Sequence, residues 1–293
     1  MNDTGGVFQI DMTLERVFDT LTEVPTFPEV VQKALALLDD PMATMADVEE
    51  LLRYDQAITA NILRVTNSAH FGLPQQVSNL QTALALLGTD QIRQILMVSA
   101  SLPYLSRPLN GYGLTARELW AHAIGCAVTA EILAGELGHG EPSLPFTAAL
   151  LHDLGKIVLD LHLGIRLEEI RLLVERERLP FDEAEWRVLG ADHAVIGYEL
   201  LHQWNFPPGI CRAVRNHHDP DLYVQDDLSA IMALSNILAV SLGMGVHGDS
   251  FRYRIAPDLA ERLGLSGESL DRCIARSLDA FYAARDLVGL VPA

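Results

Sequence analysis

Apolar residues recur at helical spacing along almost the whole chain, and this periodicity limits the folds that are available to it. Val30, Val31, Ala34, Leu35 and Leu38, for example, fall at the spacing of one helix face. No segment shows sustained alternation of period two with β-branched residues, the pattern of a half-buried strand. With 49% hydrophobic residues, the chain can also build a sizeable core. The sequence therefore predicts an all-α fold without a sheet.

Capping residues divide this pattern into short helices followed by longer ones. In the first part, Thr44 with Asp47 resembles a capping box, and Asp55 and Ser78 are expected N-caps. Gly88 is expected to be the C′ residue of the helix that Ser78 begins. In the second part we expect helices at about 115–137, 146–162, 166–178, 191–204, 208–217 and 227–243, and a last helix capped by Ser266.

The breaks between helices suggest four regions. Residues 1–13 are a polar, flexible lead-in. The clearest linker, rich in Pro and Gly, falls at 106–114, where an N-terminal helical subdomain over 14–110 gives way to a second one over 111–245. A helical tail over 246–293 completes the chain.

Charge and cysteine usage narrow the class of protein. The net charge of −18 repels phosphates and anionic headgroups, so neither nucleic acid nor a membrane is an expected partner. We see no signal peptide, and no apolar run reaches the roughly 18–20 residues of a membrane-spanning helix. Cys126, Cys211 and Cys273 are odd in number and far apart, which predicts buried, reduced thiols. We therefore expect a cytoplasmic protein.

A histidine and an aspartate stand side by side inside an apolar segment, at His152-Asp153. Burying both groups is costly unless something binds them, and a metal ion wedged against a helix would bind both. Lys156 follows one turn later, where its ammonium group could meet an anion. The doublet is weak as a signal by itself, so its meaning depends on whether the chain supplies further ligands.

Further histidines after the linker could complete such a site. They are His122, His193 and the pair His217-His218, each on a different expected helix or helix end. A helix bundle can aim all of them into one cleft. Imidazole and carboxylate ligands suit Fe, Mn, Ni or Zn, and two such ions a few ångströms apart could activate a water molecule and hold a phosphate.

Each of these residues also has a purely structural interpretation. His122 could be a helix-packing residue, and His193 could simply begin a helix that Asp192 caps. The pair His217-His218 could meet the dipole at a helix end. The remaining histidines, which show no partner pattern, are expected to be structural or exposed: His70, His139, His162, His202 and His247.

The series resembles the HD superfamily of metal-dependent phosphohydrolases, whose signature is a first His, a His-Asp doublet and a late Asp. His193 and His217-His218 resemble the longer ligand set of the HD-GYP branch. Over about residues 24–245, however, the chain most resembles the HDOD family, an HD-related output domain of bacterial signalling. Three segments carry that resemblance: Pro25-Thr26-Phe27-Pro28-Glu29-Val30, Asp55 through Leu63 to Asn67-Ser68, and Leu84-Ala85-Leu86-Leu87-Gly88.

Two departures from the enzymes of the superfamily bear on activity. Asn236 stands where the late Asp is expected, so a neutral amide replaces a charged ligand, although Asp192 or Asp219 could compensate. The segment Ile157-Val158-Leu159-Asp160 replaces the Gly-Tyr-Pro-type motif that is linked to cyclic di-GMP hydrolysis. The resemblance therefore implies metal ligands at His122, His152, Asp153, His193, His217, His218 and, weakly, Asn236.

Three functions remain open at this point. The resemblance implies a signalling protein that acts through contacts with other signalling proteins and keeps a degenerate metal site. The alternative is an active metal-dependent phosphohydrolase on a small phosphorylated or nucleotide ligand, in which Asp153 and Lys156 take part in catalysis. A helical scaffold without metal is the third.

Overall fold

The structure, a computed structural model, describes residues 27–68, 72–139, 143–162, 164–245 and 258–284. These residues form α-helices and one short 3-10 helix, and within the described ranges there is no β-strand, only an isolated bridge between Leu109 and Leu114. The all-α prediction is confirmed. No helix among the described residues is long and apolar enough to cross a membrane.

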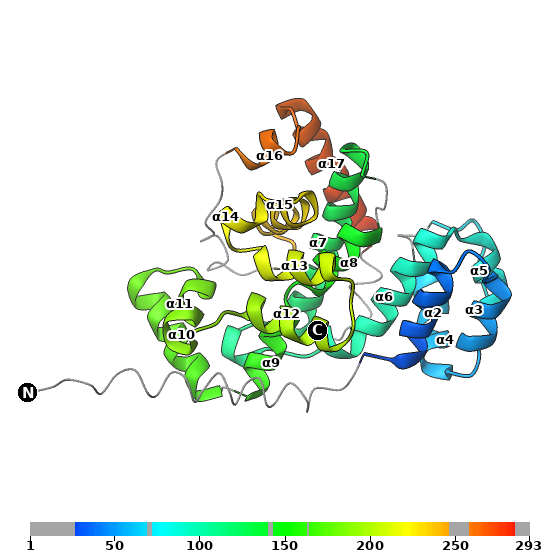
Figure 1. The fold of residues 1–293 in the computed structure, drawn as a ribbon, viewed down its shortest axis with the longest axis horizontal. Helices are drawn as coiled ribbons and strands as arrows, with labels where there is room; N and C mark the ends of the chain where they lie inside the picture. Colours follow the sequence, from blue (N-terminus) through cyan, green and yellow to red (C-terminus); the bar gives the residue numbers. More distant parts are fainter. Residues whose placement is uncertain (1–26, 69–71, 140–142, 163, 246–257, 285–293) are drawn as a thin grey trace, which may run out of the picture.

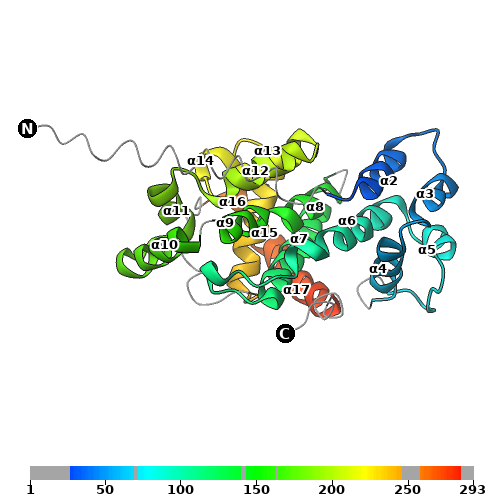
Figure 2. The same cartoon turned by 90° about the horizontal axis from the view of Figure 1, so that it is seen from below.

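The N-terminal helices group at one end of the molecule (Figure 1). They are α2 (Glu29–Asp39), α3 (Met45–Leu52), α4 (Gln56–Thr66), α5 (Leu80–Leu86) and α6 (Thr89–Leu105). The helix α6 is the longest of them and leads from this group into the rest of the chain, as Figure 2 shows from below.

The second part contains the helices that surround the candidate site. In chain order they are η2 (Asn110–Tyr112), α7 (Ala116–Glu136), α8 (Ser143–Leu151), α9 (Leu154–His162), α10 (Gly164–Glu177), α11 (Phe181–Leu189), α12 (His193–Gln203), α13 (Pro208–Asn216), α14 (Pro220–Tyr223) and α15 (Asp227–Ser241). The tail adds α16 (Leu259–Arg262) and α17 (Gly267–Ala283), and α17 packs along α7.

Most expected caps are present, with side chains bonded as the sequence indicates. The Thr44 hydroxyl and the Asp47 carboxylate form a capping box, and Asp55 and Ser266 cap α4 and α17. The expected cap at Ser78 was wrong. Asn79 rather than Ser78 caps α5, because it is the Asn79 side chain that accepts the bond from the Thr82 N–H. Gly88 follows the C-cap Leu87, where a C′ residue is expected, but its φ is −74° and not left-handed, and it is also the N-cap of α6.

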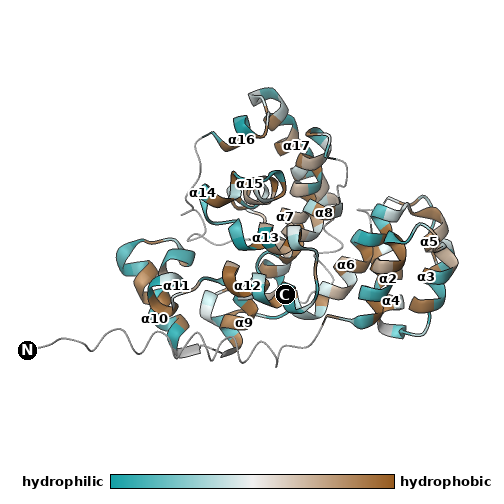
Figure 3. Cartoon of the chain, viewed as in Figure 1, coloured by the Kyte–Doolittle hydropathy of each residue, from teal (hydrophilic) through white to brown (hydrophobic). Residues whose placement is uncertain are grey.

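Three helices, α7, α8 and α15, are apolar on several faces and form the core of the second part. The helix α7 packs against α8, α15 and α17, and α13 packs against α8, α12 and α15. Figure 3 shows the contrast with peripheral helices such as α11 and α16, which carry hydrophilic residues. Side chains on α7, α8 and α15 are therefore held in rigid, water-excluded surroundings.

The two parts of the chain meet through α6 and through an aromatic cluster. The helix α6 packs against α8, and the Phe27 ring lies 5.6 Å from the Trp204 ring and 5.1 Å from the Phe206 ring. These contacts do not test the subdomain boundaries that the sequence predicts. The predicted lead-in, 1–13, lies outside the described residues.

The prediction of one continuous helix over 146–162 is wrong, because the helix is interrupted at His152-Asp153. The helix α8 ends at Leu151 and α9 begins at Leu154. The His152 Nδ1–H donates to the Ala149 carbonyl at 2.7 Å, which satisfies an acceptor that the end of α8 leaves open. At Gly155 the start of α9 lies so close to α12 that a Cβ atom would overlap the His193 backbone. The break turns both side chains of the doublet inward.

Candidate metal centre

The fold brings the predicted ligand residues together in one buried region. His122 comes from the middle of α7, and His152 and Asp153 come from the break between α8 and α9. His193 is the first residue of α12, and the pair His217-His218 directly follows α13. Each of these residues is at most 6% exposed: His122, His152, Asp153, His193, His217 and His218.

Asp153 lies between two groups of histidines. On one side, its Oδ1 is 3.4 Å from His152 Nε2 and its Oδ2 is 3.8 Å from His122 Nε2. On the other side, its Oδ1 is 3.5 Å from His193 Nε2. His193 in turn groups with His217 and His218, with ligand atoms that all lie within 4.8 Å of one another. A single carboxylate thus contacts both groups.

Three buried ligand atoms find no hydrogen-bond partner among the residues that the structure describes. They are His152 Nε2, His217 Nε2 and Asp153 Oδ1. Both imidazoles donate from Nδ1 to a backbone carbonyl, of Ala149 and Val214, so each Nε2 carries a lone pair. Leaving such an atom unsatisfied costs about 1–3 kcal/mol. The same three residues form a cluster within 4.8 Å, so their donor set fits a divalent cation.

Glu185, which the sequence analysis missed, orients His193. Its Oε2 accepts from the His193 backbone N–H at 2.8 Å and from His193 Nδ1 at 2.7 Å. Its Oε1 accepts the Tyr112 hydroxyl at 2.7 Å. Because Nδ1 donates to Glu185, Nε2 is directed into the site, where it lies 2.8 Å from His218 Nε2 and 3.5 Å from Asp153 Oδ1. Carboxylates commonly orient metal-binding histidines in this way. The helix α11 that carries Glu185 was itself not expected.

Burial keeps most of the imidazoles neutral, the form that binds a metal. It lowers the pKa of His122 to about 3, and it lowers the pKa values of His152, His217 and His218 as well. For His193, burial also opposes protonation, but the Glu185 carboxylate outweighs it and raises the pKa.

Asp153 remains ionised despite its burial. Burial alone would raise the pKa of this carboxyl, but the neighbouring side chains of His152, Lys156, His193 and His122 hold the pKa well below the usual range. The closest cation is the Lys156 ammonium, which donates to Asp153 Oδ2 at 2.8 Å. The same ammonium lies 5.9 Å from the centre of the Tyr112 ring. The Lys156 side chain is 12% exposed, more than those of Asp153 and the histidines beside it.

Asp192 and Asp219, considered as compensating carboxylates, serve as helix caps. Asp192 accepts from the Val195 N–H and from the Trp186 indole N–H. Asp219 caps α14. The structural interpretation of His193 as the first residue of a helix that Asp192 caps is thus correct, and it is compatible with a His193 side chain that faces Asp153.

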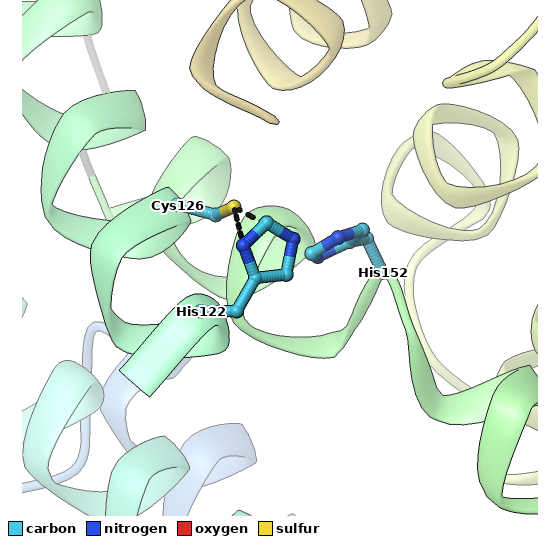
Figure 4. Close-up of side chains that lie close together, drawn as sticks. All are labelled: His122, Cys126 and His152. Atoms are coloured by element: carbon cyan, nitrogen blue, oxygen red, sulfur yellow. Dashed lines mark hydrogen bonds between the residues drawn. The ribbon is translucent and has the colours of Figure 1, made fainter. Parts of the chain in front are cut away.

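Asn236 and Cys126 lie on the α7 side of the site. Asn236, on α15, is 2% exposed, and its Oδ1 is 3.9 Å from Cys126 Sγ. Cys126 is buried and free, as expected of the three thiols, but its place beside His122 was not expected (Figure 4). The spacing of four residues on one helix could have indicated it.

The other histidines take no part in the clusters of described residues. His202 is exposed and stacks on Tyr198, and His139 is partly buried at the end of α7. His162 ends α9. His70 and His247 lie outside the described residues.

Comparison with solved structures shows the same fold in several bacterial proteins. An HDOD domain protein of unknown function from Geobacter sulfurreducens is 25% identical, with a TM-score of 0.70 over 94% of this chain and 95% of that one. A candidate phosphohydrolase from Shewanella amazonensis is 20% identical, with a TM-score of 0.73 over 92% and 97%. A candidate signal transduction protein from Marinobacter aquaeolei is 22% identical, with a TM-score of 0.74 over 96% of this chain and 66% of that one.

Sequence comparison agrees with the structural one. An uncharacterized protein of Treponema pallidum is 22% identical over 92% of this chain, which spans 51% of that protein's length. The model of the HDOD domain matches residues 24–220. On the strength of this match, the chain belongs to the HDOD domain family.

Proposed function

We propose that this chain is a bacterial cytoplasmic regulatory protein that acts through contacts with signalling proteins. Its buried histidine cluster would hold metal as a structural or sensing centre that has lost hydrolytic activity. Membership of the HDOD family supports the regulatory role, and the solved relative from Marinobacter aquaeolei is named as a candidate signal transduction protein.

The main support for this proposal is the small number of negatively charged groups around the histidines. Among the described residues, Asp153 is the one carboxylate in the metal-compatible clusters, and Lys156 already pairs with it. Glu185 is occupied by His193 and Tyr112, and Asn236 contributes a neutral amide. Two divalent cations bring four positive charges into this low-dielectric region, so a hydrolytic two-metal centre would be poorly compensated.

Burial supports the same conclusion. A phosphorylated substrate would have to reach groups that are at most 6% exposed: His122, His152, Asp153, His193, His217 and His218. Such access requires movement of the surrounding helices, whereas an ion can be held without a cleft for substrate.

A metal-dependent phosphohydrolase acting on a small phosphorylated or nucleotide ligand is the second candidate. When bound, the metal would supply Lewis acidity and a water molecule of lowered pKa. The Lys156 ammonium, beside Asp153, favours this candidate because it could steady a phosphate. Two solved relatives from Shewanella amazonensis are named as candidate phosphohydrolases. We do not propose cyclic di-GMP as the substrate, because residues 157–160 replace the Gly-Tyr-Pro-type motif. Asp160, the last of them, instead accepts a hydrogen bond from the Gly111 N–H.

A turnover screen of the metal-loaded chain separates the two candidates. Nucleotides and generic phosphodiesters are incubated with the wild type and with Asp153→Ala, each loaded with Mn²⁺, Fe²⁺, Ni²⁺ or Zn²⁺. We expect no hydrolysis that depends on Asp153. Turnover in the wild type that Asp153→Ala abolishes would overturn the regulatory proposal in favour of the enzyme.

A pull-down from the native cell tests the regulatory half. We expect the wild-type chain to retain specific signalling proteins. Retention of the same proteins by an unrelated acidic helical protein would count against specific contacts, because net charge alone would then explain the binding.

A further inference from the structure

Cys126 lies one helical turn after His122 on α7, and its sulfur faces the same buried space. Cys126 Sγ is 3.6 Å from His122 Nε2, and Cys126 is 0% exposed. Figure 4 shows the sulfur beside the His122 ring, with the His152 ring on the ring's other side. The ligand atoms of these three residues all lie within 4.8 Å of one another.

The separation of sulfur and nitrogen is that of two ligands on one metal ion. Zinc–sulfur and zinc–nitrogen bonds of about 2.3 and 2.0 Å at a tetrahedral angle place the two donor atoms about 3.5 Å apart. The observed 3.6 Å matches that separation without any movement of α7. His122 Nε2 also faces Asp153 Oδ2 at 3.8 Å, so thiol and carboxylate approach the same nitrogen.

His152 provides an independent observation. Its side chain is completely buried, and its Nε2 has no hydrogen-bond partner among the described residues. The His152 and His122 ring centres are 5.2 Å apart. A buried nitrogen with a free lone pair beside a thiol and a second imidazole is the arrangement that a metal ion would satisfy.

On this side of the site, Asn236 contributes a neutral amide where a carboxylate is expected. Asn236 Oδ1 lies 3.9 Å from Cys126 Sγ, so the neutral amide and the thiol are neighbours. We propose that Cys126 is a ligand of the metal ion held by His122, His152 and Asp153, and that its thiolate supplies the negative charge that Asn236 cannot. As the sulfur–metal bond forms, the sulfur–hydrogen bond breaks and the proton leaves to solvent.

This assignment rests on the proposed metal centre and specifies its chemistry. His122, His152 and Cys126 form one cluster, and Asp153 Oδ2 lies 3.8 Å from His122 Nε2, so the carboxylate would be the fourth ligand of this ion. Sites filled by four protein ligands are typical of structural rather than catalytic metals. A thiolate also selects ions with an affinity for sulfur, such as Zn²⁺ or Fe²⁺, over Mn²⁺ or Mg²⁺. Cys126 therefore agrees with a centre that holds its ion and does not turn over substrate.

Cobalt substitution tests the assignment by absorption spectroscopy on the full chain. Co²⁺ is added to metal-free wild type and to Cys126→Ser, with Cys273→Ser as the matched control, since Cys273 is also a buried free thiol. We expect a sulfur-to-cobalt charge-transfer band in the wild type and in Cys273→Ser. The band should be absent from Cys126→Ser, whose Co²⁺ affinity should fall at least about tenfold.

The outcomes separate this inference from the proposed centre. Visible cobalt bands without a charge-transfer band in the wild type, or a charge-transfer band that persists in Cys126→Ser, would overturn the role of Cys126 and leave the centre intact. No binding of Co²⁺ by the wild type would remove the centre itself. If Cys126→Ser does not fold, the double variant Cys211→Ser/Cys273→Ser leaves Cys126 as the single thiol, and a band retained there supports the assignment while its loss refutes it.

Discussion

One carboxylate oxygen of Glu185 accepts two hydrogen bonds from the same residue, His193, at 2.8 Å from the backbone N–H and at 2.7 Å from the imidazole Nδ1. This double contact fixes both the start of α12 and the orientation of the His193 ring. We predict that Glu185→Gln lowers metal affinity about 10–100-fold, because outer carboxylates orient histidine ligands. Competition with a chromophoric chelator measures the affinity. Glu183→Gln on the same helix, which removes a partly exposed ion pair with Arg187, should change it little.

Gly155 allows α9 to approach α12. A Cβ at this position would overlap the backbone of His193 and Gly197, so Gly155→Ala must push the two helices apart. We predict a loss of about 1–3 kcal/mol in the free energy of unfolding, together with weaker metal binding. Chemical denaturation measures the first. Gly135→Ala is the matched control, since a Cβ there meets no atom within 4 Å and α7 should tolerate it or gain stability. Equal effects of the two substitutions would contradict this role of Gly155.

Restoring a carboxylate at position 236 should strengthen the centre. The Asn236 side chain is buried beside Cys126, and Asn236→Asp would add a further negative charge close to the proposed metal. We predict at least about a tenfold gain in metal affinity, measured by competition with a chromophoric chelator. Unchanged affinity in a folded Asn236→Asp protein would show that this side chain does not reach the metal.

Without metal, the protein should lose stability as the pH falls below the normal range of histidine. Burial lowers the pKa of His122 to about 3, and it lowers those of His152, His217 and His218. Between those values and about 6.5 the unfolded chain binds protons that the folded chain does not, so stability rises with pH by about 1.4 kcal/mol per unit for each such histidine. His193 acts in the opposite sense and only above about pH 6.5, because its pKa is raised: its contribution to stability is complete below that pH and is lost as the pH rises through the raised pKa.

Urea denaturation of the metal-free protein at about pH 7 and about pH 5 measures this dependence. His122→Asn should remove roughly one proton's share of the slope, whereas His202→Asn, at an exposed position, should leave it unchanged. A denaturation midpoint that does not move between the two pH values would contradict the buried, neutral state of these histidines.

Local sequence signals predicted the helices well where capping and periodicity agree. The capping box at Thr44 and Asp47 and the N-caps at Asp55 and Ser266 are where the sequence places them. The break at His152-Asp153 was not foreseen, because apolar residues continue on both sides of the doublet, and the close approach of α12 at Gly155 cannot be read from local sequence. Ser78 and Asn79 are both good caps, and local sequence does not choose between them.

The residues of the candidate site were also predicted only in part. Its histidines were recognisable as a series because their order around the His152-Asp153 doublet resembles the HD ligand set, and the fold does place them together. Glu185 and Cys126 were not recognised, since a buried Glu on a surface helix and a lone Cys on a core helix acquire meaning only from their neighbours. Such residues depend on contacts between helices that no local pattern encodes.

Metal content tests the central claim most directly. Wild type, His152→Ala, Asp153→Ala and the exposed control His202→Ala are purified without chelator, and their Fe, Mn, Ni and Zn are measured by elemental analysis. We predict near-stoichiometric metal in the wild type and in His202→Ala, and its loss from both His152→Ala and Asp153→Ala. A wild-type protein that folds without any of these metals, or variants that retain them fully, would contradict a metal centre built on His152 and Asp153.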